Sequence, residues 1–195
     1  MSDSKFFPTA PHATPPDSWR ILKTHVIGQA GPRTDLFVDP FEGTRSTAAP
    51  TLLFPVDGDF LWQARVRVQF SSKFDAGVLL LFRDKSNWAK LCFEFSPHRK
   101  PTIVSVVNRG VSDDCNSTEV PGAEVYLRIA RRGQGIALHC SEDARRWSLV
   151  RAFRAAGGAW KAGFLVQSPT GQGCRAEFRR IRFRPEAIGD IRSGA

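Results

Sequence analysis

The sequence lacks any run of about 18 apolar residues, the length that a membrane-spanning helix needs, so it predicts no such helix. It also lacks a basic N-terminal region followed by an apolar core, and we therefore expect no signal peptide. The four cysteines are widely spaced, form no Cys-x-x-Cys pair, and have none of the clustered neighbours of a zinc site. These absences predict a cytoplasmic protein with free, buried thiols at Cys92, Cys115, Cys140 and Cys174.

Signatures of known chemistry are also missing. The chain has no Gly-x-Ser-x-Gly elbow, no phosphate-binding loop, no dinucleotide fingerprint and no calcium loop. Its four histidines stand far apart in an arm, in turns or edges and in one strand, which does not suggest a catalytic triad. We therefore predict no catalytic residue, no metal ligand and no cofactor.

Positive charge and aromatic residues are abundant. The chain has 15 Phe and 5 Trp against a single Met, a composition that favours strands with aromatic cores. The formal net charge of +9 favours acidic partners in general, but no recognition helix, zinc finger or RNA-binding signature accompanies it. A solvated basic surface is thus favoured over nucleic-acid binding. The basic residues become denser toward the C-terminus: Arg145, Arg146, Arg151, Arg154, Arg175, Arg179, Arg180, Arg182 and Arg184.

Short runs with β-type composition recur between turn residues, and no capped stretch has helical periodicity. This pattern predicts one all-β domain, a two-sheet sandwich over residues 19–184, preceded by a proline-rich arm over residues 1–18 and followed by an irregular tail over residues 185–195. The predicted strands are 20–27, 34–39, 51–55, 59–70, 75–83, 87–96, 102–108, 125–131, 135–141, 146–153, 160–168 and 173–184.

Alternation within these strands predicts which side of each is buried, because successive side chains point to opposite faces. Residues 76–82 are apolar at every position, which indicates a central strand covered on both faces. In residues 87–96, alternation places Leu91 and Phe93 in the core between the sheets. Trp88, Lys90 and Glu94 then lie on the outer face. For the next strand we expect Val104 and Val106 inside and Ser105 outside, and for residues 125–131 we expect Tyr126 and Arg128 outside.

This outer face is the candidate binding site. We predict a polar groove lined by Trp88, Lys90, Glu94 and Ser105, with Asp75 and Tyr126 at its margin. An indole can stack on a sugar ring while the polar side chains fix its orientation. Two alternatives remain open: Trp88 as a core residue beneath a covering loop, and Lys90 and Glu94 as an ordinary polar pair on a solvated face.

Five segments carry a resemblance: Arg33-Thr34-Asp35-Leu36-Phe37, residues 75–80, residues 87–94, Ser105-Val106-Val107 and residues 140–147. Their order and spacing resemble a bacterial and fungal family of uncharacterised concanavalin A-like domains that includes the yeast regulation-of-enolase protein. The resemblance covers Trp19 to Phe183 and implies a jelly-roll sandwich with an intracellular role near carbohydrate metabolism. The family usually has glycine where this chain has Ala144, so a turn with positive φ is in question there.

The function we expect is non-catalytic recognition of a carbohydrate or a small polar ligand. The alternative is a regulatory, protein-interaction domain, with enolase as a partner implied by the resemblance alone. A sugar-active hydrolase or lyase is the least favoured reading. Glycoside hydrolysis needs two facing carboxyl groups, and Glu94 has Cys92 and Ser96 where the partners would stand on its own strand.

Overall fold

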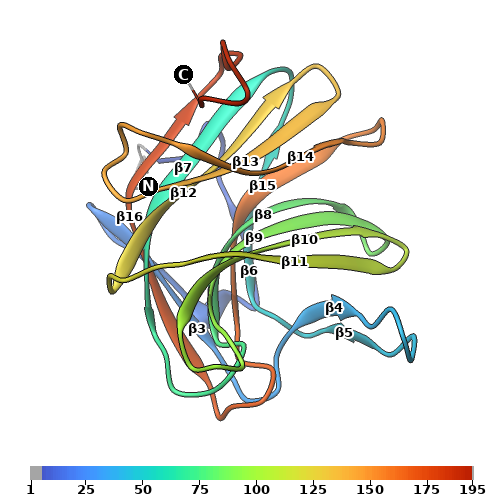
Figure 1. Ribbon diagram of the computed structural model, residues 1–195, viewed down its shortest axis with the longest axis vertical. Helices are drawn as coiled ribbons and strands as arrows, with labels where there is room; N and C mark the ends of the chain where they lie inside the picture. Colours follow the sequence, from blue (N-terminus) through green and yellow to red (C-terminus); the bar gives the residue numbers. More distant parts are fainter. Residues whose placement is uncertain (1–5, 195) are drawn as a thin grey trace.

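The computed structural model describes residues 6–194, and it confirms the all-β prediction. Two seven-stranded antiparallel sheets pack face to face (Figure 1). Among the described residues the helical content is one 3₁₀ turn, η1 (Pro16–Ser18), and no helix there is long and apolar enough to cross a membrane. In spatial order, sheet A contains β1 (His12–Thr14), β6 (Thr51–Val56), β15 (Trp160–Gln167), β8 (Ala76–Asp84), β9 (Asn87–Phe95), β10 (Pro101–Arg109) and β11 (Ser112–Glu119).

Sheet B forms the other layer, and a short hairpin forms a separate two-stranded sheet. In spatial order, sheet B contains β14 (Ser148–Arg154), β13 (Gly135–Ser141), β12 (Glu124–Arg132), β7 (Phe60–Gln69), β16 (Cys174–Arg184), β3 (His25–Ala30) and β2 (Trp19–Ile21). The hairpin consists of β4 (Leu36–Val38) and β5 (Arg45–Thr47).

The ends of the chain contribute more to the fold than an arm and a tail would. Within the predicted arm, His12–Thr14 pairs with β6 and adds an edge strand to sheet A, and Phe7 packs against the core. Residues 1–5 of the arm and Ala195 of the tail lie outside the described residues. The tail is irregular, but Ile188 is buried against the outer face of sheet B with Leu61 and Ala137.

The main core lies between the two sheets and is rich in aromatic rings. The Phe164 and Phe178 rings stack with centroids 4.1 Å apart, and the Trp62 ring lies 5.0 Å from Phe164. Leu91 and Phe93 are fully buried in this core, as the alternation of β9 predicts. Interdigitated rings of this size supply much of the apolar area that stabilises the sandwich.

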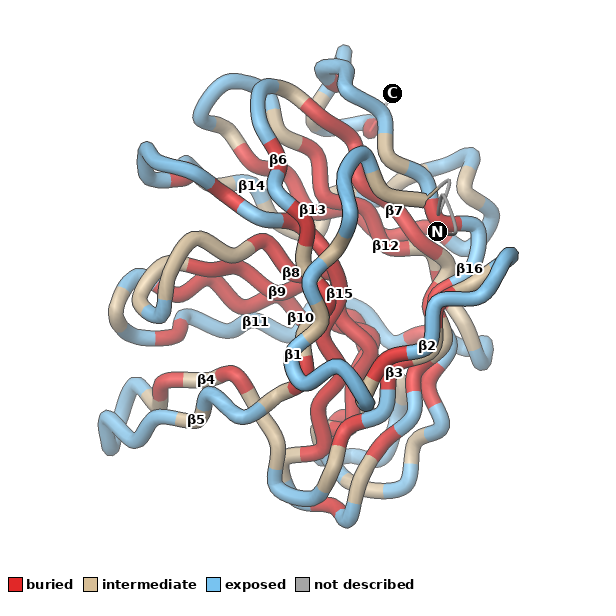
Figure 2. Tube along the Cα trace, turned by 180° about the vertical axis from the view of Figure 1, so that it is seen from behind, coloured by how far each residue is buried: buried red, intermediate tan, exposed pale blue. Residues whose placement is uncertain are grey.

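A second, smaller core lies on the outer face of sheet A. Leu36 and Phe37 of the β4–β5 hairpin pack there with Val78, Leu80 and Trp88. Figure 2 shows the hairpin projecting alongside the buried strands of this sheet. The structure thus confirms that residues 76–82 form a strand covered on both faces, and the covering element is the hairpin.

The observed register shows that the predicted inner and outer faces of β10 were exchanged. Ser105 pairs with Leu91, and Val106 pairs with Lys90. Directly opposed residues of an antiparallel pair share a face, so Val104 and Val106 point outward and Ser105 points into the main core. Because β10 is apolar on both faces, its alternation alone did not fix the register that the β9–β10 turn imposes.

Candidate functional site

Four polar side chains meet on the outer face of sheet A, and we call them the polar cluster: Asp35, Lys90, Glu94 and Gln167. Glu94 and Gln167 come from the two strands that flank β8, and both pair in register with Ala76. Because alanine has a short side chain, the two longer side chains can reach toward each other across it. Asp35 lies on the hairpin segment, directly before β4 in the sequence.

Lys90 is the centre of the polar cluster. Its Nζ donates to Gln167 Oε1 at 2.9 Å and to Asp35 Oδ1 at 3.2 Å. Only 2% of the Lys90 side chain is exposed, against 18% for Asp35. Burial by itself would lower the pKa of Lys90, but the neighbouring acidic groups, with Asp35 contributing most, together outweigh burial and raise that pKa above its ordinary value. Lys90 is therefore a buried cation with its counter-charge in place.

Glu94 has the opposite electrostatic character. Burial raises the pKa of Glu94 to about 8, and the positive charge of Lys90 offsets this only in part, while the charges of Asp35 and Asp114 add to it. At neutral pH the carboxyl group is thus mostly protonated and carries an O–H donor. Within residues 6–194 its side chain has one long contact, 3.5 Å from Gln167 Nε2 to Oε2. Glu94 therefore keeps hydrogen-bonding capacity to spare.

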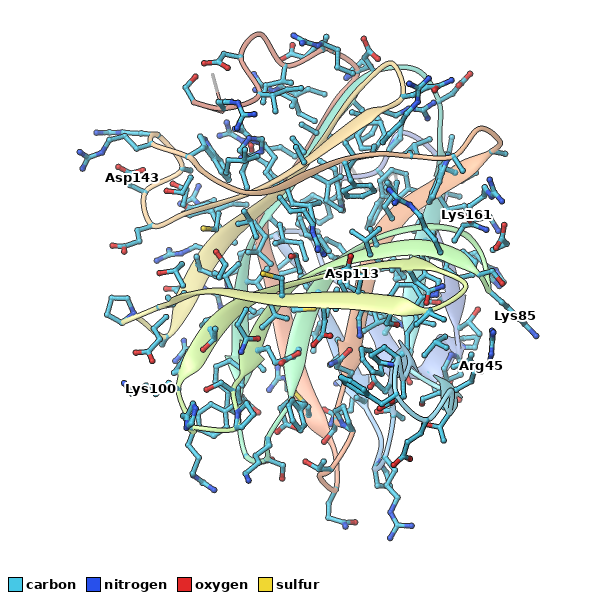
Figure 3. All side chains as sticks on the ribbon, turned by 45° about the vertical axis from the view of Figure 1, so that its right-hand side comes forward. Arg45, Lys85, Lys100, Asp113, Asp143 and Lys161 are labelled. Atoms are coloured by element: carbon cyan, nitrogen blue, oxygen red, sulfur yellow. The ribbon has the colours of Figure 1, made fainter. Side chains whose placement is uncertain are left out.

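Hydrogen bonds hold the β4–β5 hairpin at the end of this face where β10 turns into β11. The Val38 amide donates to Ser112 Oγ, and Arg45 donates to the Gly110 carbonyl. In Figure 3, Arg45 and Lys85 lie on one side of the molecule and Lys100 on the other. Glu94 belongs to the Lys100 end, because Thr102 is its partner in β10. Beyond Thr102 lies β11, whose residues from Asp113 to Glu119 are exposed.

Trp88 does not line a groove. It is 1% exposed, and it packs in the second core that the hairpin covers, which is the alternative that the sequence left open. The Lys90 ammonium lies 5.6 Å from the centroid of its ring. Ser105 is also misplaced by the prediction, because it lies on the opposite face, 1% exposed, and its hydroxyl has no hydrogen-bond partner among the described residues.

Asp75 and Tyr126 also lie outside the polar cluster. Asp75 is fully buried; its Oδ2 accepts from the Ser71 and Ser72 amides and its Oδ1 accepts from Ser168 Oγ at 2.7 Å. This carboxylate holds the β7–β8 loop against the end of β15. Tyr126 points outward from sheet B, as predicted, where the Arg65 guanidinium lies 5.6 Å from its ring centroid.

The structure thus brings together two of the six predicted residues, Lys90 and Glu94, and adds two that sequence reasoning missed. Asp35 lies within a segment that carried the family resemblance, but its distance from Lys90 in the chain hid the contact. Gln167 is the polar residue that ends the apolar run of β15. Among residues 6–194, no group of three or more His, Cys, Asp or Glu side chains could hold a metal ion.

Comparisons with known proteins support the architecture. The family described as "Protein of unknown function (DUF1349)" matches residues 13–186. A functionally unknown protein from Saccharomyces cerevisiae has a similar structure, with a TM-score of 0.83 and 21% identity over 90% of this chain and 96% of the yeast chain. No curated protein matches the sequence.

Two further solved structures are similar in fold. The GH43 protein BlXynB from Bacillus licheniformis gives a TM-score of 0.71 at 14% identity over 87% of this chain, which spans only 35% of BlXynB. A legume lectin-like domain from Entamoeba histolytica gives 0.59 at 11% identity, with 91% of each chain covered. At these identities the likeness concerns the fold alone, a jelly-roll sandwich of the lectin-like kind.

Proposed function

Since the chain belongs to the DUF1349 family, we propose that it is a non-catalytic domain that binds a carbohydrate or a small polar ligand beside Glu94, at the end of the polar cluster toward Thr102. The observation that carries the proposal is the protonated, under-used carboxyl group of Glu94. It lies next to an amide and to an ammonium group. A site of this kind offers both donors and acceptors to a neutral ligand.

Neutral sugars suit such a site because each hydroxyl both donates and accepts. A protonated carboxyl group can do the same, whereas an ionised one only accepts. The Lys90 ammonium has three N–H donors, and it makes two hydrogen bonds within residues 6–194. The exposed polar residues of β11, among them Asp114 and Asn116, supply further groups along the rim on the same side of the sheet.

The fold adds general support, since a lectin-like domain shares it. The residues that would contact the ligand differ from those first expected. Lys90 and Glu94 keep their proposed role, and Asp35 and Gln167 position them. Trp88 is removed from the proposed contact surface because it is buried.

Catalysis is a weaker proposal for the same residues. Glycoside hydrolysis requires one carboxyl group as acid and a second, free one as nucleophile or base. Asp35 is the nearest candidate for the second role, but it is ion-paired to Lys90 and accepts a hydrogen bond from the Leu36 amide at 2.7 Å. A carboxylate held in this way is poorly placed to attack a substrate or activate a water.

The β4–β5 hairpin favours a second candidate function, a regulatory protein-interaction domain. Phe41 lies at the turn of this hairpin and is 94% exposed. An aromatic side chain presented in this way is typical of residues that insert into a partner. Enolase as that partner, and a cytoplasmic location, rest on the family resemblance and on the free cysteines.

A glycan array followed by calorimetry tests the main proposal. We expect a neutral oligosaccharide to bind to the wild-type protein and to raise its melting temperature. Glu94→Met should weaken that binding about tenfold or more, since it removes both the donor and the acceptor of the carboxyl group from a buried site. Glu186→Met, the same change at an exposed residue of the tail, should leave binding unchanged. Equal affinities for the wild-type protein and Glu94→Met would refute the site.

A further inference from the structure

A second polar pocket lies on the outer face of sheet B, away from the polar cluster. It has a volume of about 380 Å³, within the range of small-molecule sites. Its lining contains four arginines and two aromatic residues but no carboxylate: Gln63, Tyr126, Arg128, Ala144, Trp147, Arg180, Arg182 and Arg184. We call it the arginine pocket.

A β-bulge in β16 adds one of these arginines. Arg179 pairs with Arg65 and Arg182 with Gln63, so β16 has one more residue than β7 between the two pairs. Regular alternation would turn Ile181 outward, but in the structure Ile181 is buried in the main core. The extra residue is Arg180, which adopts φ of 50°, a conformation that residues with a β-carbon rarely take. Bulges that re-aim side chains are common beside functional sites.

A turn in the β13–β14 loop forms the opposite wall of the arginine pocket. Asp143 accepts hydrogen bonds from the amides of Arg145 and Arg146, and Ser141 Oγ accepts one from the Ala144 amide. Ala144 has φ of 60°, so the turn keeps the positive φ that the missing glycine had put in question. This turn leads directly to Trp147, whose ring centroid lies 3.9 Å from the Arg128 guanidinium carbon.

Arg128 is an unusual cation because it is 3% exposed and has no ion pair among residues 6–194. Its Nη2 donates to the Gly194 carbonyl, but its buried Nε has no hydrogen-bond partner there. Burial, with the nearby charge of Arg184, lowers the pKa of Arg128 to about 10. A buried guanidinium stabilised only by a carbonyl and a ring leaves a positive potential that an anion would offset.

The exposed arginines of the pocket are incompletely paired as well. Arg184 has Glu186 at 3.0 Å. Arg180 and Arg182 have no carboxylate within ion-pair distance among the described residues. Elsewhere on the same face pairs do form, as between Arg65 and Glu124 at 2.7 Å. Arg67 and Arg175 on the same face also lack an ion pair among the described residues. The arginine pocket is therefore distinguished by the convergence of its four arginines on one concavity.

We propose that the arginine pocket binds the phosphate group of a small phosphorylated metabolite, with Arg180 and Arg182 as its main ligands and Trp147 and Tyr126 beside the ring that carries the phosphate. Guanidinium groups match phosphate oxygens with paired hydrogen bonds, and aromatic side chains pack against a sugar or base ring. A small molecule suits the site better than nucleic acid, because the cations converge on one concavity whose size fits a single phosphorylated ring.

The proposal can be tested by calorimetry with glucose 6-phosphate, inorganic phosphate and glucose as probes. We expect saturable one-to-one binding of glucose 6-phosphate, weaker binding of inorganic phosphate and none of glucose at this site. Arg180→Ala/Arg182→Ala should reduce the affinity for glucose 6-phosphate by about tenfold or more. Arg20→Ala/Arg175→Ala removes the same charge from exposed positions outside the pocket and should change that affinity less than about twofold.

Three outcomes would overturn the proposal. The first is the absence of saturable binding of both glucose 6-phosphate and inorganic phosphate. The second is an equal loss of affinity for glucose 6-phosphate in the two double variants, which would mean that net charge alone attracts the anion. The third is tighter binding of a short DNA duplex than of glucose 6-phosphate, together with loss of the affinity for DNA in the Arg180→Ala/Arg182→Ala protein. That result would reassign the pocket to nucleic acid. Glu94→Gln should leave glucose 6-phosphate binding intact, so the two proposed sites fail independently.

Discussion

The Lys90 ammonium lies 3.2 Å from Asp35 Oδ1, and this contact ties β9 to the hairpin segment that covers it, across a separation of 55 residues in the sequence. Both groups are largely removed from water. Loss of one partner would therefore leave the other as an uncompensated charge in a poorly solvated place.

We predict that Asp35→Asn lowers the free energy of unfolding by about 3 kcal/mol, because it removes the counter-charge of a buried ammonium while keeping the shape of the side chain. Asp35→Asn/Lys90→Met should lose less than the sum of the two single variants. Urea denaturation of all three proteins measures this coupling. Glu119→Gln, which breaks the exposed pair with Lys100, should cost less than about 1 kcal/mol.

A second prediction concerns pH. Burial raises the pKa of Glu94 from 4.5 to about 8, despite the offsetting charge of Lys90, so between these values the folded protein binds a proton that the unfolded chain has released. This group therefore adds stability at low pH that is lost as pH rises through about 8, with a slope of at most about 1.4 kcal/mol per pH unit.

Urea denaturation between pH 5 and 8 tests this dependence. Subtracting the curve of Glu94→Gln from that of the wild-type protein isolates the contribution of Glu94, because the other titrating groups cancel. A difference that is constant across this range would show that Glu94 has an ordinary pKa.

A third prediction follows from the burial of Trp88. Trp88→Ala should destabilise the protein by about 3–5 kcal/mol, since it opens a cavity between the hairpin and sheet A. Phe41→Ala removes an aromatic ring of the same hairpin at a 94% exposed position and should change stability by less than about 0.5 kcal/mol. Similar thermal melts for these two variants would place Trp88 at the surface.

The fourth prediction concerns Gly163 in β15. A β-carbon added there would clash with the Leu52 carbonyl oxygen of the neighbouring strand, so the backbone would have to move. We expect Gly163→Ala to cost at least about 2 kcal/mol through this overpacking. Gly157→Ala is the matched control, because nothing lies within 4 Å of its added β-carbon. Chemical denaturation of the two variants decides the point, and equal stabilities would contradict the close approach.

The sequence by itself determined the fold class and, in strands with a clear alternation of apolar and polar residues, which face is buried. Recurrent short β-type runs predicted a sandwich, and alternation placed Leu91 and Phe93 in the main core and Arg128 outside, as observed. Local patterns sufficed because each reflects the period-two geometry of a single strand. The uniformly apolar β8 likewise required a covering element, although nothing in its own residues identified the hairpin.

Only the tertiary structure decided which residues meet. Strand register turned Ser105 into the core, because β10 is apolar on both faces and a shift of one residue exchanges them. Packing of the hairpin buried Trp88 and brought Asp35 to Lys90. The bulge at Arg180 and the turn at Ala144, both with positive φ at residues other than glycine, built the arginine pocket. Contacts between segments far apart in the chain depend on register and packing, which alternation within one strand does not encode.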